Sequence, residues 1–249
     1  MKKFLFVDLD DTLFSSIAKC ASDAELQPAA YLKDRTACSF TTARQRAFFG
    51  MMDASTTLIP ATARNRDAFG RVDLAFSSYK ILNYGGLILK PDGEPDAYWM
   101  EHMRAETAAA LPGLRQAIAV IDGYADSIGL TTRARLIEDG GLPFYVVAKD
   151  PDKIGERLAP FDTEALAPWV ADVGGFYIHR NGNNLALLPD ALNKARAVEY
   201  VSHLLRQQHG EILTMGMGDS RSDARFMAAC DYAIIPNGTQ LAALTVGAL

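Results

Sequence analysis

The chain has 249 residues, of which 49% are hydrophobic and 22% charged, and its formal net charge is −5. This length and composition fit one large α/β domain, or a core with an insertion, and argue against disorder. The acidic balance makes nucleic acid an improbable partner, and no apolar run approaches the roughly 20 residues of a membrane helix.

Strands and helices are predicted to alternate over the first 90 residues. The apolar run 4–7 ends at a polar cluster, which is typical of a buried parallel strand. A second strand is predicted at 57–59, and helices at 41–52 and 65–72. Two further strands, 80–82 and 87–89, are separated by Gly85 and Gly86. Such alternation favours a parallel sheet covered by helices.

The middle of the chain follows a different pattern, which begins at the turn-forming segment 91–95. The predicted elements are two helices, then strands that pair across Gly140 and Gly141, then a short helix and a hairpin that turns at Asn181 and Gly182. Their ranges are 97–110 and 114–128 for the helices, 131–137 and 143–148 for the strands, 153–158 for the short helix, and 175–179 with 185–188 for the hairpin.

The last part of the chain returns to the first pattern. A helix at 193–208 ends before Gly210, and a strand at 212–215, a helix at 221–229 and a strand at 232–235 follow. We therefore predict an α/β protein whose core is a doubly wound, mainly parallel sheet. The core comprises residues 1–90 and 184–249, and an α+β cap domain at 91–183 is inserted between them.

The cysteines and the first residues favour a cytoplasmic protein. The three cysteines are widely spaced and form neither a disulfide framework nor a zinc-binding pattern. Asp8 cuts the first apolar run short, so that run is too short for a signal peptide.

Polar clusters follow the predicted strands at the ends where open parallel sheets bind ligands. The first contains Asp8 and Asp10, and the second contains Thr62 and Arg64. Lys194 begins a core helix, and the last cluster spans 218–223, with Asp219 and Asp223. A carboxylate can attack phosphorus, provided that a cation screens the repulsion between two anions. Further carboxylates, a lysine and a threonine hydroxyl suit a magnesium ion and the phosphoryl oxygens.

These clusters resemble, in their order and in their positions at strand ends, the four motifs of haloacid dehalogenase superfamily phosphatases. The insertion between the second and third motifs resembles the subgroup with a large α+β cap, type IIB, which includes sucrose-phosphate and mannosyl-3-phosphoglycerate phosphatases. The resemblance covers nearly the whole chain. The motif residues are Asp8-Leu9-Asp10-Asp11-Thr12-Leu13-Phe14, Thr62, Lys194 and Gly218-Asp219-Ser220-Arg221-Ser222-Asp223.

The resemblance implies a role for each matching residue. Asp8 matches the nucleophile, and Asp10 matches the general acid and base. Thr62 and Lys194 match the pair that stabilises the phosphate. Arg64 matches an arginine that often follows the threonine in that subgroup, and it is expected to bind phosphate with them. The implied Mg²⁺ ligands are Asp8, the backbone carbonyl of Asp10, Asp219 and Asp223. Two positions depart from the family pattern: Asp11 replaces a frequent glycine, and Ser222 a frequent asparagine.

The expected function is a Mg²⁺-dependent phosphomonoester hydrolase that forms an aspartyl phosphate on Asp8. Its substrate is expected to be a sugar phosphate or another small phosphorylated metabolite. The sequence leaves open a phosphotransferase or phosphosugar mutase, and a protein that binds sugar phosphates without turning them over. A phospho-accepting receiver domain fits poorly because of the chain length, the insertion and the carboxylates that follow Lys194. The sequence does not indicate an oligomeric state.

Overall fold

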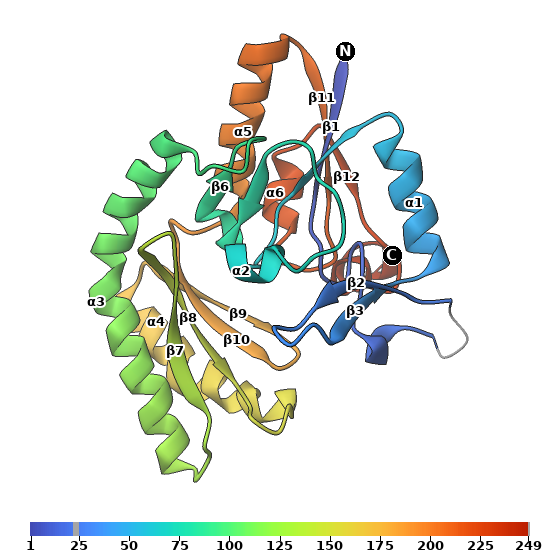
Figure 1. Cartoon of the computed structure of the whole chain (residues 1–249). Helices are drawn as coiled ribbons and strands as arrows, with labels where there is room; N and C mark the ends of the chain where they lie inside the picture. Colours follow the sequence, from blue (N-terminus) through green and yellow to red (C-terminus); the bar gives the residue numbers. More distant parts are fainter. Residues whose placement is uncertain (22–24, 249) are drawn as a thin grey trace. The chain divides into compact units, whose positions relative to one another are not determined.

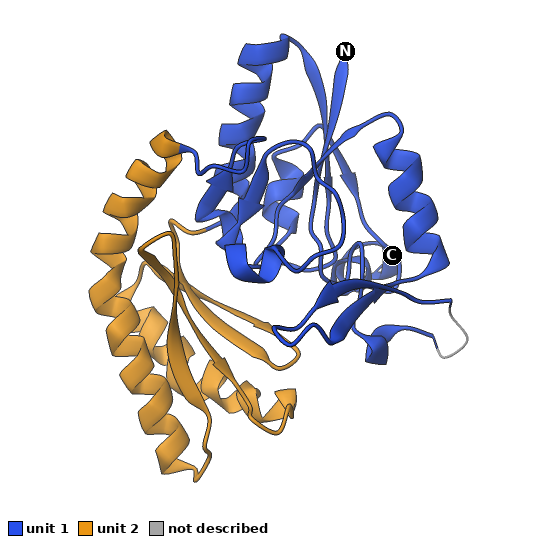
Figure 2. Cartoon of the chain, viewed as in Figure 1, with its two compact units in different colours: residues 1–96, 193–249 blue, residues 97–192 orange. Residues whose placement is uncertain are grey.

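The structure is a computed structural model that describes residues 1–21 and 25–248 (Figure 1). The chain forms two compact units (Figure 2). Unit 1 comprises Met1–Asp96 and Asn193–Leu249, and unit 2 comprises Ala97–Leu192. Among the described residues, no helix is both long enough and apolar enough to cross a membrane.

The centre of unit 1 is a parallel four-stranded sheet in the order β12-β11-β1-β4. Its strands are β1 (Lys2–Val7), β4 (Thr57–Pro60), β11 (Ile212–Met217) and β12 (Tyr232–Ile234). Val7 pairs with both Met217 and Pro60, so these three strands end level with one another. The polar residues that follow them therefore meet at one edge of the sheet.

Helices lie on both sides of this sheet, which confirms the predicted fold class. Figure 1 shows α1 (Ala43–Asp53) on one side and α5 (Lys194–His209) on the other. Thr42 starts α1 with a reciprocal capping box, and the side chain of Asn193 caps α5. The helices at 65–72 and 221–229 are shorter than predicted, namely α2 (Arg66–Phe69) and α6 (Ala224–Ala228).

Smaller elements complete unit 1. One hairpin, β2 (Gln27–Tyr31) with β3 (Ala37–Thr41), was not predicted. The other joins β5 (Lys80–Leu82) to β6 (Leu87–Leu89); both strands were predicted, but they pair antiparallel in a sheet of their own and not in the parallel sheet. The remaining elements are α7 (Gln240–Leu244) and 3₁₀ turns at Ile17–Lys19, Asn83–Gly85 and Val246–Ala248.

Unit 2 contains an antiparallel sheet in the order β7-β8-β10-β9, backed by a long helix. A buried apolar cluster, which includes Leu114, Ile121, Val146 and Phe161, fills the space between them. The elements are α3 (Ala97–Ser127), β7 (Arg133–Asp139), β8 (Leu142–Lys149), a 3₁₀ turn (Gly155–Leu158), a π-helical segment (Phe161–Leu166), α4 (Ala167–Val173), β9 (Phe176–Asn181) and β10 (Asn184–Pro189).

The boundaries of unit 2 differ from the predicted range 91–183. The unit runs from Ala97 to Leu192, because β10 pairs with both β8 and β9 and so belongs to this sheet. The hairpin turn at Asn181 and Gly182 is present. The Asn183 side chain makes two hydrogen bonds to the backbone of Asp150. Its Nδ2 atom donates to the Asp150 carbonyl at 2.9 Å, and its Oδ1 atom accepts from the Asp150 N–H at 3.0 Å.

The two helices predicted at 97–110 and 114–128 are one helix, α3, with Pro112 inside it. An internal proline removes a backbone hydrogen bond and disfavours a helix by about 3 kcal/mol. Leu114, Ala117 and Ile121 on the following turns are at most 1% exposed. We attribute the continuity of α3 to the burial of this apolar face, which offsets the cost of Pro112.

Candidate active site

Three predicted residues meet in a buried ionic cluster at the edge of the sheet. Asp8 directly follows β1, and Lys194 is the first residue of α5. The Lys194 Nζ atom donates to Asp8 Oδ1 at 2.5 Å and to Asp223 Oδ1 at 2.7 Å. All three residues are at most 6% exposed. One ammonium group is thus shared by two carboxylates that come from opposite ends of the chain.

Asp219 brings a third carboxylate to this cluster. One oxygen atom each of Asp8, Asp219 and Asp223 lies within 4.8 Å of the others. Asp219 also accepts a hydrogen bond from the Thr12 hydroxyl at 3.3 Å. Three carboxylates and one ammonium group leave an excess of negative charge when all are ionised. A hard divalent cation such as Mg²⁺, which prefers oxygen ligands, fits this donor set.

Burial and neighbouring charges shift the pKa values of the cluster in different directions: those of Asp8, Asp219 and Lys194 rise, and that of Asp223 falls. Burial raises the pKa of Asp8 well above its ordinary value, and Asp223 and Asp219 add to this, although Lys194 opposes it. Burial also raises the pKa of Asp219, to about 6, with Asp223 and Asp11 contributing. Burial acts to raise the pKa of Asp223 as well, but Lys194 and Ser220 together lower it. Burial disfavours the charged form of Lys194, yet the two carboxylates raise its pKa overall.

The loop that carries Asp219 and Asp223 is closely packed. A Cβ atom at Gly218 would lie 2.4 Å from the Cβ of Asp223, so only glycine fits there. Ser220 donates from its hydroxyl to Asp223 Oδ2 at 2.6 Å, and the Ser220 and Ser222 hydroxyls lie 2.8 Å apart. Ser222, which replaces the usual asparagine, therefore belongs to a hydrogen-bonded chain that leads to Asp223.

Asp10 forms a two-point ion pair with Arg64 and is not one of the three described carboxylates that lie close together. Arg64 Nε donates to Asp10 Oδ2 at 2.8 Å, and Nη2 donates to Oδ1 at 2.7 Å. The Arg64 side chain is 15% exposed, and its guanidinium group lies 5.1 Å from the centre of the Phe14 ring. Such a planar fork fixes the direction of a carboxylate. Arg64 is thus a positioning residue for Asp10 in this structure.

Asp11 occupies a backbone conformation that explains the frequent glycine at this position. Its φ is 62°, in the left-handed region that glycine adopts readily and aspartate tolerates. The Asp11 carboxylate pairs with Lys19 at 2.5 Å. The substitution therefore keeps the turn and adds a negative charge that also raises the pKa of Asp219.

Thr62 is fully buried, and its hydroxyl oxygen accepts a hydrogen bond from the backbone of Arg64 at 3.1 Å. A left-handed turn holds this segment: the backbone N–H groups of Asn83 and Tyr84 donate to the carbonyls of Arg64 and Thr62. Asn83, Tyr84 and Gly85 all have positive φ values. A Cβ atom at Gly85 would lie 2.6 Å from the Asn193 carbonyl oxygen, so this turn also packs against the start of α5.

Sequence reasoning missed several residues that support the site. Thr12 and Ser220 each bind a predicted site carboxylate, and Lys19 binds Asp11 of the first motif. Thr12 and Ser220 lie inside the quoted motifs, so their positions carried a signal. Lys19 lies outside the motifs, and only the folded chain brings it to Asp11.

Asp219→Asn is expected to stabilise the metal-free protein at pH 8 by about 1–3 kcal/mol. The folded-state pKa of Asp219, about 6, lies above the ordinary value of 3.8. The stability that this group contributes is therefore present below pH 4 and is lost as the pH rises through 6. Urea unfolding in EDTA should show a difference between variant and wild type that shrinks towards pH 4. A less stable variant at pH 8 would contradict this account of the cluster.

Two solved structures, both of proteins named as phosphatases, share the fold of this chain. The C-terminal domain of trehalose-6-phosphate phosphatase from C. albicans aligns with 92% of this chain and 73% of that chain, with a TM-score of 0.55 and 12% identity. The sucrose-phosphatase of Synechocystis sp., solved with sucrose and phosphate, aligns with 99% of this chain and 97% of that chain, with a TM-score of 0.50 and 15% identity. At 12% and 15% identity these likenesses show a shared fold, in agreement with the α/β fold class predicted from the sequence.

A curated relative shows a shorter match in sequence. It is the glucosyl-3-phosphoglycerate/mannosyl-3-phosphoglycerate phosphatase of Persephonella marina, which is 34% identical over 67 residues. The match covers 26% of this chain and only 25% of that protein. No family model matches the sequence.

Proposed function

We propose that this protein is a magnesium-dependent phosphatase that acts on a sugar phosphate or another small phosphorylated metabolite. The proposal is carried by the buried cluster in which Asp8 and Asp223 share the ammonium group of Lys194, with Asp219 beside them. A carboxylate nucleophile and a phosphate dianion repel each other. Positive charge must therefore lie beside both before the Asp8 oxygen can reach phosphorus. The substrate class rests on the names of the phosphatases that share the fold.

The proposed reaction has two steps. In the first, an Asp8 carboxylate oxygen bonds to phosphorus while the bond from phosphorus to the substrate oxygen breaks, and Asp10 gives its proton to the departing alcohol. In the second, Asp10 takes a proton from water and the water oxygen bonds to phosphorus. The bond from phosphorus to the Asp8 oxygen breaks, so that phosphate leaves and the Asp8 carboxylate is restored. Lys194 and the Thr62 hydroxyl would stabilise phosphoryl oxygens in both steps.

The metal would act by screening charge. Mg²⁺ held by Asp8, Asp219, Asp223 and the Asp10 carbonyl would neutralise the carboxylates and the approaching phosphate. The Asp10–Arg64 ion pair bears on the proton transfer, because Arg64 occupies both carboxylate oxygens of Asp10 and one of them has to carry the proton. We infer that one of these oxygens leaves Arg64 when substrate binds, while Arg64 keeps its hydrogen bond to the other oxygen and so still fixes the direction of the carboxyl group.

The test is phosphate release from a panel of sugar, sugar-acid, nucleotide and cofactor phosphates, measured with Mg²⁺ and with EDTA. The proposal requires release that depends on Mg²⁺ and that favours sugar or sugar-acid phosphates. Transfer of phosphate to a second hydroxyl of a sugar, without free phosphate, would favour the mutase. Binding of sugar phosphates with no reaction and no phosphorylated Asp8 would favour a binding protein.

Arg64→Ala is expected to lower kcat/KM about 100-fold for alkyl phosphates and much less for p-nitrophenyl phosphate. An alkoxide needs a proton in order to leave, and Arg64 positions the carboxyl group of Asp10 that supplies it. Nitrophenolate leaves without that proton. Arg64→Lys keeps the charge but loses the two-point contact, so it should give an intermediate result. Equal losses for both substrates would show that Arg64 acts on phosphate rather than through Asp10.

A further inference from the structure

A second group of charged side chains lies on unit 1, separate from the residues discussed above. It surrounds a surface hollow of about 360 Å³. One wall comes from the turn between β2 and β3, and the other from α2 and the residues that follow it. We call this feature the basic hollow; its residues are Lys33, Arg35, Arg66, Asp67, Gly70 and Arg71.

The basic hollow concentrates positive charge on an acidic protein. It contains four cationic side chains and one carboxylate, whereas the chain as a whole has a net charge of −5. That carboxylate, Asp67, is already bound to Arg71 at 2.6 Å. Among the described residues, neither Lys33 nor Arg35 forms an ion pair within 4.0 Å, and both are exposed.

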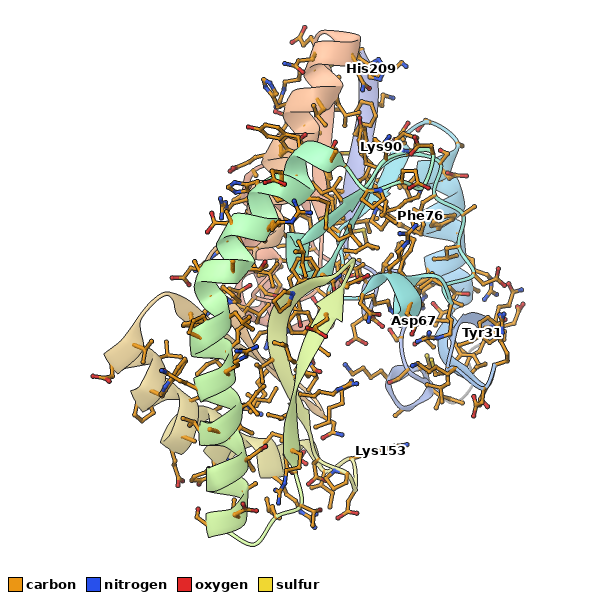
Figure 3. All side chains as sticks on the ribbon, turned by 60° about the vertical axis from the view of Figure 1, so that its left-hand side comes forward. Tyr31, Asp67, Phe76, Lys90, Lys153 and His209 are labelled. Carbon is orange, nitrogen blue, oxygen red and sulfur yellow. The ribbon has the colours of Figure 1, made fainter. Side chains whose placement is uncertain are left out.

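Two of the arginine side chains are held by hydrogen bonds to backbone carbonyl groups. Arg71 Nε donates to the carbonyl of Tyr31 at 3.0 Å, which joins the hairpin to α2 (Figure 3, where Tyr31 and Asp67 are labelled). Arg66 Nη2 donates to the carbonyl of Gly93 at 3.2 Å. Arg35 is held in the turn by its backbone, whose N–H donates to the carbonyl of Leu32 at 3.1 Å. The Arg66 and Arg71 side chains are therefore positioned by the fold before any ligand arrives, which lowers the entropic cost of binding.

We propose that the basic hollow binds a small molecule that carries two or more phosphate groups, at a site distinct from the Asp8 cluster. Guanidinium groups recognise phosphate through paired, charge-assisted hydrogen bonds, and three arginines with one lysine suit an anion of several charges. The volume is that of a small-molecule site. Without a metal, the Asp8 cluster cannot bind such an anion in place of the basic hollow, because its three carboxylates outnumber the one Lys194 ammonium group and would repel the anion.

The test is a calorimetric titration of the full chain with pyrophosphate, in EDTA at low ionic strength. We expect saturable binding by the wild type. Lys33→Ala/Arg35→Ala should weaken it at least 10-fold. The matched control Lys3→Ala/Arg44→Ala removes the same charge from exposed positions outside the hollow and should stay within 2-fold of the wild type. Circular dichroism checks the fold, and Arg66→Gln provides a second variant on the opposite wall.

Several results would overturn the proposal. One is the absence of saturable binding by the wild type, and another is an equal loss in the hollow variant and its control. Binding that disappears in Lys194→Met but persists in both hollow variants would place the anion at the Asp8 cluster instead. Because the titration involves no turnover, its outcome is independent of whether the chain is a phosphatase.

Discussion

Asp8→Asn is expected to lower the rate of Mg²⁺-dependent phosphate release by at least about 10⁴-fold. The amide keeps the shape of the side chain but cannot serve as the nucleophile that forms the aspartyl phosphate. Because burial already raises the pKa of Asp8, loss of its charge should not destabilise the metal-free fold. The measurement is steady-state phosphate release on the best substrate of the panel, together with urea unfolding.

Mass spectrometry of the quenched protein provides the matching control. A phosphate adduct should appear on the wild type during turnover and should be absent from Asp8→Asn. Asp10→Asn, which retains the nucleophile, should instead lose most of the steady-state rate while still binding substrate. Full activity in Asp8→Asn would refute the proposed mechanism.

Lys194→Met is expected to lower the free energy of unfolding of the metal-free protein by about 3–5 kcal/mol at pH 8. The methionine fills the space of the lysine stem but leaves Asp8 and Asp223 without the buried ammonium group that they share. The raised pKa of Lys194 means that its contribution is fully present below its ordinary value of 10.5. Chemical unfolding in EDTA measures the loss, which should shrink at pH 5 as the carboxylates take up protons.

A double variant separates the charge effect from packing. Lys194→Met/Asp223→Asn should regain part of the lost stability, because one unpaired carboxylate is gone, but should remain inactive. Saturating Mg²⁺ should also restore stability to the single variant in part, because it supplies positive charge to the same oxygens. If Lys194→Met is as stable as the wild type in EDTA, the ion cluster is not the source of stability claimed for it.

The parts of the site that lie at strand ends could be predicted from the sequence. Asp8 follows a short apolar run, and Gly218 and Asp219 follow a later strand. Parallel strands end at a common edge, so the sequence predicts both where these carboxylates lie and that they act together. The partner of Asp10 could not be found this way. Arg64 was known to follow the second strand, but its pairing with Asp10 depends on side-chain directions that only the folded chain defines.

Errors in the fold came from local signals that tertiary packing overrides. Pro112 predicts a break in the helix. α3 nevertheless continues past it, because the apolar residues on the following turns are buried. The β2–β3 hairpin was missed because its turn, at 32–36, contains neither glycine nor asparagine, and Arg35 takes up the positive φ instead. Strand β10 was assigned to the core because its pairing with β8 depends on contacts between residues distant in sequence.

The central strand β1 has consequences for the order in which the chain folds. Its neighbour β11 lies more than 200 residues later in the sequence, whereas the whole of unit 2 is contiguous. During synthesis, unit 2 can therefore fold while β1 still lacks a partner on one side. Until β11 (Ile212–Met217) emerges, that strand presents unpaired backbone groups and apolar side chains to other chains. A ribosome-bound nascent chain truncated before β11 should accordingly contain a protease-resistant unit 2 beside an unfolded remainder.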